Sequence, residues 1–376
     1  MSERAKPRSL VSVFDAIPDP REDARTKHAL TDILVITLAA TMSGAESFEA
    51  VHRFALDQKD WLKTFLPLAN GIPSADTIWR VHQLLNPKVF ASCVVDWLAE
   101  ACDATGLNHI AIDGKSVRGA KGDTFSRRLH LVTAWATANG VVLGQEAVAA
   151  KSNEITAIPE LLKTLHLKGA LVTIDAAGTH VEIARQIVDQ GGDYLLPVKG
   201  NQPTLLAACE ANFAQAQATE FADAAVTEHA SVEQAHGRTD GRYTLALANP
   251  KGLPAAWAGA KAVVQVNRVR TVGDRTTTTT TYYLCSRRLA ARTLAQPIRR
   301  HWAIENNLHW TLDVIFREDD NRTRDQNAGA NLGLIRRTAI SLLKRAPGKD
   351  SLKTRRMQAA WNADFRLKAL QGFPAI

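Results

Sequence analysis

The sequence predicts an α/β protein in which an all-helical N-terminal domain precedes a larger domain built on a mixed sheet. Apolar residues recur at helical spacing up to about residue 105, and from about residue 108 short apolar runs alternate with helical segments. Asn139-Gly140 lies between two apolar runs, which is a strong signal for a β-hairpin turn. A hairpin followed by alternating helices and parallel strands indicates a mixed sheet covered by helices.

The N-terminal domain, residues 1–105, is predicted to be a small helical bundle. The first long helix presents Leu30, Leu34 and Leu38 at helical spacing. A second helix is predicted from about Ser47 to Phe65. The segment 71–77 contains Gly, Pro, Ser and Asp, which predicts a break followed by the cap of a third helix.

The second domain, residues 106–346, is predicted from short apolar strands separated by helices. Strands are expected at 109–113, 129–136, 141–148, 169–175 and 193–198, and helices at about 154–165, 180–190 and 203–217. Residues 220–285 then read as a β-rich insertion, and the threonine run 276–281 within it predicts an exposed strand.

The C-terminal part is predicted to contain one amphipathic helix and a basic tail. In the helix at about 328–345, Leu332, Ile335, Ala339 and Leu342 are expected to face inward. Arg336, Arg337 and Lys344 are expected to face solvent. Residues 347–376 are predicted to form a less ordered basic tail.

Composition favours an intracellular protein with an anionic partner. The chain has 376 residues, of which 45% are hydrophobic, and a formal net charge of +8. For such a chain nucleic acid is the commonest partner. The four cysteines are far apart and form no CxxC pair, which indicates reduced thiols in the cytoplasm. Neither a signal peptide nor a membrane-spanning run is expected, since the longest uncharged N-terminal run is too short.

Two aspartates, Asp113 and Asp175, are each predicted to end a buried strand. Side chains at the C-terminal ends of parallel strands converge on one edge of the sheet. Two carboxylates brought together repel unless a cation lies between them, and Mg²⁺ accepts oxygen ligands of this kind. The alternative for either aspartate alone is a turn or helix cap.

The stretch 301–313 contains His301, Glu305 and His309 at intervals of four residues, which predicts one helical face. Trp302, Leu308 and Leu312 are expected on another side of that helix. A zinc site is disfavoured because the two histidines lie two turns apart. Glu305 could supply a third acid beside the aspartates, and its rivals for that place are Glu154, Glu182 and Asp313.

Ordered motifs along most of the chain resemble a known family. They are Ile17-Pro-Asp-Pro-Arg21, the segments 71–77 and 111–119, Lys151-Ser-Asn-Glu-Ile155, Val172-Thr-Ile-Asp-Ala176, Leu196-Pro-Val-Lys-Gly-Asn-Gln202, His236-Gly-Arg238 and His301-Trp-Ala-Ile-Glu-Asn306. With these motifs the chain resembles the DDE-type insertion-sequence transposases, in the group that includes the H-repeat-associated proteins.

The resemblance implies a ribonuclease H-like fold with a β-rich insertion before the last acid. It implies metal-dependent DNA cleavage and strand transfer at terminal inverted repeats, with Asp113, Asp175 and Glu305 as catalytic acids and metal ligands. The expected cofactor is Mg²⁺, with Mn²⁺ as an alternative, and the expected partner is double-stranded DNA bound by a homodimer.

The sequence departs from related transposases outside this group at three positions. Ile298, His301 and Leu312 stand where those proteins have a tyrosine, an arginine and a lysine. Basic and histidine side chains near the acids are therefore the candidate phosphate contacts; they are Lys115, Arg118, Lys199, Arg299, Arg300, His301 and His309. The rival functions are a catalytically inactive DNA-binding protein derived from a transposase, and a nuclease that cuts DNA without joining it.

Overall fold

The described part of the chain forms two compact units. The computed structural model describes residues 9–22, 26–101, 108–120, 128–138, 140–148, 152–222, 224–235 and 237–371. One unit contains Met1–Ala104, Gly114–Leu165 and Glu305–Ile376, and the other contains Thr105–Asp113 and His166–Ile304. The two units therefore do not follow the order of the chain, and the predicted boundary at 105–106 lies outside the described residues.

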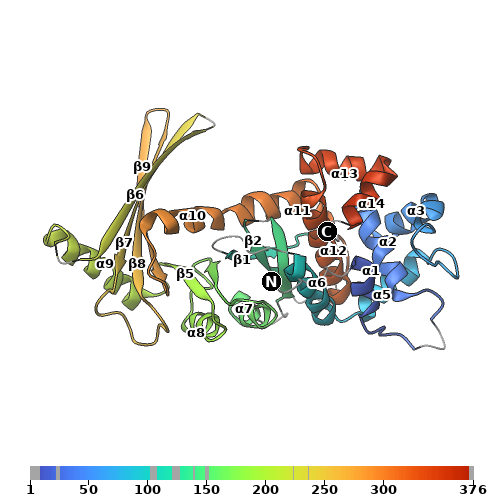
Figure 1. Cartoon of the computed structure of the whole chain (residues 1–376), viewed down its shortest axis with the longest axis horizontal. Helices are drawn as coiled ribbons and strands as arrows, with labels where there is room; N and C mark the ends of the chain where they lie inside the picture. The colour runs from blue at the N-terminus through green and yellow to red at the C-terminus, as the bar shows by residue number, and fades with distance from the viewer. Residues whose placement is uncertain are drawn as a thin grey trace, which may run out of the picture. The chain divides into compact units, whose positions relative to one another are not determined.

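The first unit is mostly helical. Its N-terminal helices are α1 (Leu10–Asp15), α2 (Leu30–Met42), α3 (Phe48–Asp57), α4 (Lys59–Leu62), α5 (Ala75–Leu84) and α6 (Pro87–Ala101) (Figure 1). Almost every residue of α2 is buried, which makes it the centre of the bundle. Ser74 caps α5 by accepting the backbone N–H of Thr77, as the sequence predicted. The single helix expected from Ser47 to Phe65 is wrong, because the chain forms α3 and α4 there instead.

The same unit contains a β-hairpin and the helices that pack near it. Strands β2 (His130–Ala136) and β3 (Val141–Ala147) pair antiparallel, which confirms the predicted hairpin. Helix α7 (Glu154–Lys163) and helix α12 (Gln326–Arg345) both pack against β3. Helix α12 also contacts α2 and α5, so it is enclosed on several sides.

The C-terminal segment is helical and packed, so the prediction of a loose basic tail is wrong. It forms α13 (Leu352–Trp361) and α14 (Ala363–Gln371). The guanidinium of Arg366 lies 4.0 Å from the ring centre of Trp61 and donates to the carbonyl of Ala359 at 2.8 Å. Arg355 donates to the carbonyl of Leu343 at 2.9 Å. These arginines bind backbone carbonyls and an aromatic ring, and this packing orders the segment.

The second unit contains most of the strands. Its strand order is β1-β4-β5-β9-β8-β7-β6, with β1 (Asn108–Ser116) passing into the first unit at Gly114. Strands β1, β4 (Ala170–Ile174) and β5 (Asp193–Val198) run parallel, and β5 pairs antiparallel with β9 (Arg275–Cys285). The remaining elements of this unit are α8 (Val181–Asp189), α9 (Pro203–Ala218), β6 (Val226–Ala235), β7 (Arg238–Ala248), β8 (Ala262–Val272) and α10 (Ala291–His301). Parallel and antiparallel pairs thus occur together, and the predicted mixed α/β architecture is confirmed.

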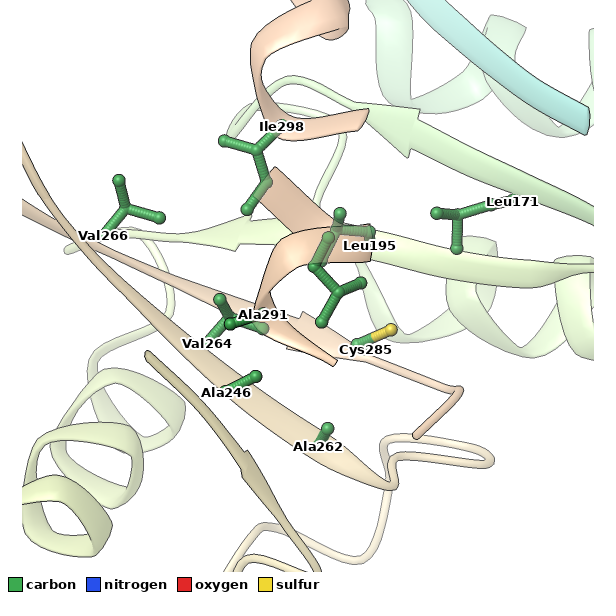
Figure 2. Close-up of a cluster of buried hydrophobic side chains, with 10 residues drawn as sticks. Leu171, Leu195, Ala246, Ala262, Val264, Val266, Cys285, Ala291 and Ile298 are labelled. Atoms are coloured by element: carbon green, nitrogen blue, oxygen red, sulfur yellow. The ribbon is translucent and has the colours of Figure 1, made fainter. Parts of the chain in front are cut away.

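The predicted β-rich block is confirmed, and its four strands span Val226 to Cys285. Strands β6 to β9 form consecutive antiparallel pairs, and β6 was not foreseen. The threonine run forms part of β9, and its residues are exposed apart from the half-buried Thr281. Figure 2 shows the core between α10 and the inner ends of these strands, where Ala291 and Ile298 lie near Val264 and Val266.

The described cysteines form no disulfide, as the sequence predicted. Cys93, Cys209 and Cys285 are free thiols, whereas Cys102 lies outside the described residues. Burial raises the pKa of Cys209 and Cys285 to about 12, so both thiols stay protonated at neutral pH. In the described part of the chain, helices of the length and hydropathy needed to cross a bilayer do not occur.

Candidate active site

Asp113 and Asp175 lie on neighbouring parallel strands at the same level. Ile112 of β1 is the register partner of Ile174 of β4, and the next residue on each chain is the aspartate. Asp175 directly follows the end of β4, as predicted. Asp113 does not end its strand, because β1 continues to Ser116, so that part of the prediction is wrong. Neighbouring strands are about 4.8 Å apart, which keeps the two positions close.

A hydrogen-bonded turn fixes the chain after Asp175. One carboxylate oxygen of Asp175 accepts the backbone N–H of Gly178 at 2.9 Å, and the hydroxyl of Thr179 donates to the carbonyl of Pro197 at 2.8 Å. Asn201 and Gln202 donate to the carbonyls of Ala176 and Thr179 at 2.8 and 3.0 Å. Asp175 therefore closes a turn, the ordinary role considered for it, while the Lys199–Gln202 segment braces that turn. The bracing role of these two amides was not foreseen.

The buried His109, the half-buried His301 and Thr173 connect β1, β4 and α10 next to the aspartates. His109 Nε2 lies 2.8 Å from the hydroxyl of Thr173, and the same hydroxyl lies 3.0 Å from His301 Nδ1. Burial lowers the pKa of His301 to about 4, and burial with the nearby charges of His301 and Arg300 lowers that of His109 to about 3. Both rings are therefore neutral at pH 7. A neutral His301 hydrogen-bonds Thr173 here, and its contact with phosphate stays a prediction.

Glu305 lies in a π-helical turn. The helix that begins at Ala291 ends at His301, a π-helix spans Ile304–His309, and α11 spans Trp310–Val314. A π-turn bonds residue i to i+5, so the predicted single face with a repeat of four is interrupted here. The carboxylate of Glu305 is exposed, and Leu308 is fully buried. Such turns occur frequently at functional sites.

The predicted division of residues 301–313 into a buried and an exposed side is only partly right. Leu308 and Leu312 are fully buried, whereas Trp302 and Trp310 are 56% and 54% exposed. His309 is half-buried, and burial together with the charges of Arg337 and Lys115 lowers its pKa to about 3. A neutral His309 can contact phosphate only as a hydrogen-bond partner without a charge, and that contact stays a prediction.

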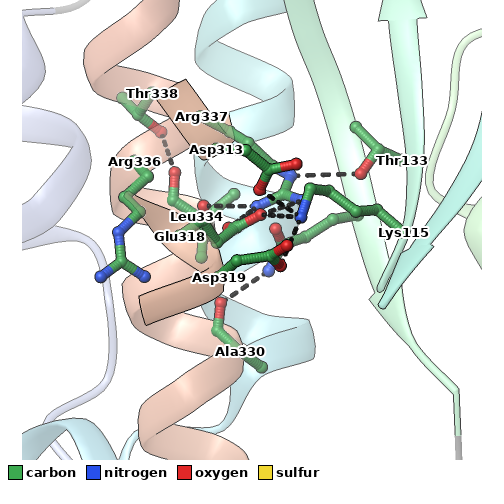
Figure 3. A network of polar contacts seen from close by, with 12 residues as sticks. Lys115, Thr133, Asp313, Glu318, Asp319, Ala330, Leu334, Arg336, Arg337 and Thr338 are labelled. Carbon is green, nitrogen blue, oxygen red and sulfur yellow. Dashed lines mark hydrogen bonds and ion pairs between the residues drawn. The ribbon is translucent and has the colours of Figure 1, made fainter. Parts of the chain in front are cut away.

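A charged cluster, defined here as Lys115, Asp313, Glu318, Asp319 and Arg337, lies within the first unit (Figure 3). Lys115 Nζ lies 2.7 Å from Asp313, 3.1 Å from Asp319 and 3.7 Å from Glu318. Lys115 is 8% exposed, and three carboxylates already compensate its charge. In the structure Lys115 thus binds carboxylates of its own unit, and its contact with phosphate stays a prediction.

Arg337 is the second cation of this cluster and is fully buried. It donates to Glu318 at 2.6 Å, to the hydroxyl of Thr133 at 3.1 Å and to the carbonyl of Gly333 at 3.1 Å. The neighbouring Arg336 is 1% exposed, and burial lowers its pKa to about 10, which leaves it charged at pH 7. The prediction that both arginines face solvent is wrong, because α12 is enclosed by other elements on its polar side as well.

The carboxylates of the cluster respond differently to burial and charge. Burial acts to raise the pKa of Glu318, but the charges of Arg337, Arg336 and Lys115 outweigh it, so the pKa is lowered. Burial raises the pKa of Asp313, although Lys115 opposes this shift. Glu318 is thus held firmly ionised by its cations.

The remaining candidates for phosphate contact are more exposed. Arg118, Lys199 and Arg300 are exposed, with Arg118 Nε 3.3 Å from Asp319. Arg299 forms an ion pair with Glu233 of β6. Among the rivals for the third acid, Glu154 lies 2.7 Å from His130, Asp313 is paired with Lys115, and Glu182 is 3.3 Å from Arg185.

Comparison with known proteins identifies the family. A family model described as "Transposase DDE domain" matches residues 104–342, and a model described as "DDE_Tnp_1-associated" matches residues 11–98. The chain belongs to the DDE transposase family. The resemblance drawn from the sequence motifs is thereby confirmed.

Relatives in Escherichia coli cover nearly the whole chain of this transposase. It is 37% identical to "Putative transposase YncI" of strain O157:H7, over 95% of this chain and 93% of that protein. It is 36% identical to "H repeat-associated putative transposase YhhI" of strain K12, over 97% and 98% of the two chains. A shorter K12 relative, "Inactive transposase YbfQ", is 39% identical over 20% of this chain and 88% of its own length.

Proposed function

We propose that this transposase cleaves DNA at the terminal inverted repeats of an insertion sequence and joins the released 3′ hydroxyls to target DNA. Asp113, Asp175 and Glu305 are the catalytic acids of this proposal. The observation that carries it is the register of β1 and β4, in which Ile112 is opposite Ile174 and an aspartate follows each isoleucine. Two carboxylates at one level of adjacent parallel strands are an arrangement that attracts a cation.

The two aspartates offer oxygen donors of the kind that a hard divalent cation takes, although among the described residues no three His, Cys, Asp or Glu side chains are grouped closely enough to hold a metal ion. Asp113 and Asp175 are both partly exposed, and carboxylate oxygens are the ligands that Mg²⁺ prefers, with Mn²⁺ as an alternative. When bound, such ions supply charge stabilisation at the attacking and leaving oxygens of a phosphoryl transfer. The protein holds Asp175 in place through its turn and leaves carboxylate oxygens available as ligands.

Glu305 is the best-supported third acid because its rivals already have partners. Glu154 is held by His130, and Asp313 by Lys115. Among the residues that the structure describes, none forms a hydrogen bond or an ion pair with the exposed carboxylate of Glu305. A carboxylate without such commitments can bind a metal ion at no cost to another interaction.

A ribonuclease H-like catalytic domain is also part of the proposal. The antiparallel pair β2–β3 and the parallel strands β1, β4 and β5 are consistent with that fold. The family match supports DNA as the partner. Binding as a homodimer follows from the need to bring two element ends together.

The decisive experiment compares Asp113→Asn with the wild type on supercoiled DNA that carries the element ends. We expect Mg²⁺-dependent cleavage to fall more than about a hundredfold, because losing even an outer-shell partner of a metal costs about 10–100-fold. Binding to the same DNA is expected to persist, since the change removes a negative charge. Glu182→Gln is the matched control, because Glu182 is an exposed acid of the same unit.

Each outcome separates the candidate functions. Retained cleavage by Asp113→Asn contradicts the assignment of the acids. Cleavage without joined products identifies a nuclease instead of a transposase. Wild-type protein that shifts the DNA and never cuts it supports the catalytically inactive alternative.

A further inference from the structure

The distal parts of strands β6 to β9 have two chemically different faces. Residues that are directly opposite on paired strands lie on the same face of a sheet. Arg270 is opposite Asp240 of β7 and Thr277 of β9, and Arg268 is opposite Arg242 and Thr279. Val272 is opposite both Arg238 and Arg275. We name this side, with Arg238, Arg242, Arg268, Arg270 and Arg275, the arginine face.

The opposite side, named here the threonine face, carries the intervening residues. Thr278 is opposite Val269, and Thr280 is opposite Asn267, which is itself opposite Tyr243. Along the described residues of β6 to β9, all lysine and arginine positions fall on the arginine face. Solubilising surfaces intersperse charges of both signs, so an excess of arginines on one side of the sheet points to an anionic partner on that side.

The arginine face is on the side of the sheet against which helix α10 packs. Its residues Ala291, Leu294 and Ile298 pack with Val264 and Val266, which lie on the same face as Arg268 and Arg270 (Figure 2). The other face is covered near its inner end by α9, where the rings of Phe213 and Tyr282 are 5.9 Å apart. The arginine face therefore continues outward from α10, the helix that leads along the chain to Glu305.

Acids of the described residues that pair with this face only partly balance its charge. Asp240 is the shared partner of three arginines, at 2.8 Å from Arg270, 3.0 Å from Arg268 and 3.2 Å from Arg238. Glu233 is paired with Arg242 at 3.6 Å and with Arg299 of α10. Four strand arginines and Arg299 thus share two acids, which leaves an excess of three positive charges among these groups. Like charges at this spacing are destabilising unless an anion compensates them.

Exposure leaves these cations accessible to an anionic partner. The side chains of Arg238, Arg268 and Arg270 are 44%, 36% and 34% exposed. The exposed hydroxyls of Thr277 and Thr279 lie between or beside them and can donate to phosphate. Guanidinium groups pair with phosphate oxygens through two parallel hydrogen bonds, and the family match favours DNA as the source of the phosphate.

We propose that the arginine face binds the phosphate backbone of duplex DNA and is a DNA-docking surface of this transposase, separate from the acids. The inference rests on the proposed function, because it takes DNA as the substrate. It assigns DNA contact to the inserted strands and, within them, to one side only.

Two adjacent threonines of β9 provide a matched test. Thr277→Glu adds a negative charge on the arginine face opposite Arg270, whereas Thr278→Glu adds the same charge to the threonine face. Both threonines are exposed and lie in the same strand, so the two variants have equal composition and net charge. Affinity is measured on random-sequence duplex DNA across a salt series, and thermal unfolding verifies that both variants are folded.

We expect Thr277→Glu to weaken binding on the order of tenfold and to reduce the salt slope by about one, as for loss of one phosphate contact. Thr278→Glu is expected to bind like the wild type. As a second variant, Arg268→Ser removes a cation from the same face and is expected to act in the same direction.

The inference is overturned if Thr277→Glu and Thr278→Glu weaken binding equally, or if neither changes it. If the wild type nevertheless cleaves DNA at the element ends, the proposed function stands and only the docking surface is wrong. If the wild type neither binds nor cleaves duplex DNA, both the docking surface and the proposed function are wrong.

Discussion

Removal of the buried Arg337 side chain should be among the most destabilising single changes in the described part of the protein. Arg337 is fully buried, and its partner Glu318 is fully buried as well. In Arg337→Met the apolar volume is largely kept, while the 2.6 Å ion pair and the hydrogen bond to Thr133 are lost. Glu318 then remains as a buried carboxylate with fewer cations.

The expected loss of unfolding free energy depends on the cations that remain around Glu318. Breaking a buried ion pair by removing one partner costs about 3–5 kcal/mol. Lys115, at 3.7 Å, and the charge of Arg336 still compensate Glu318 in part. We therefore expect the lower end, about 3 kcal/mol, against a total stability of about 5–15 kcal/mol for a typical protein.

Urea unfolding measures this loss without adding salt, which would screen the charges. Arg322→Met is the control, because Arg322 is exposed and lies in the same unit, and its change should stay within about 0.5 kcal/mol. In the double variant Arg337→Met with Glu318→Leu, much of the stability should return, because no buried charge is left uncompensated.

The pH dependence of the unfolding free energy gives a second, independent test. In the wild type the pKa of Glu318 is lowered, so its stabilising contribution is present above its ordinary value of 4.5 and is lost as pH falls through the folded-state pKa. Without Arg337, burial raises that pKa, and protonation at acidic pH relieves the penalty. The stability gap between wild type and Arg337→Met should therefore narrow as pH falls toward 4.5. A loss below about 1 kcal/mol, the range of surface ion pairs, would refute the reasoning.

The sheet around the aspartates could be predicted because its signals are local. The apolar runs before Asp113 and Asp175 each lie within a few residues, and strands form there; the hairpin of β2 and β3 also forms, although Asn139 of its predicted turn lies outside the described residues. The extension of β1 beyond Asp113 was missed because Gly114 and Lys115 resemble a strand end. Lys115 remains in the strand and is buried because carboxylates distant in sequence compensate its charge.

The errors in the C-terminal third share a physical cause. Leu332 and Ile335 indicate one buried face of α12 correctly, but periodicity cannot reveal that the opposite face is enclosed too. Arg336 and Arg337 can be buried only because Glu318 supplies a charge from another element. That pairing is tertiary, so no local pattern reports it.

The arginine face was visible in the sequence as a period of two. Arg268 and Arg270, like Arg238 and Arg242, occupy alternate positions, which places each set on one side of a strand. The strands were predicted from β-propensity alone, without considering on which side of each strand the charged residues lie. The π-turn at Glu305 is different, because an i to i+5 turn leaves no periodic signal over so short a segment.

Two further predictions concern Lys115 of the charged cluster and Gly119, which lies against the backbone of Asp319. Lys115→Met should lower stability by more than about 1 kcal/mol, because Asp313 and Asp319 lose their shared cation, yet it should leave the salt slope of DNA binding unchanged. A reduced salt slope would instead support the predicted phosphate contact of Lys115. Gly119→Ala should destabilise by about 1–3 kcal/mol, because its new methyl group would clash with the backbone carbonyl of Asp319, which cannot move aside as a flexible side chain could. Gly241→Ala is the control, since the nearest atom to its methyl group would be 3.7 Å away, and equal unfolding free energies for the two variants would show that the segment at Asp319 is not rigidly held.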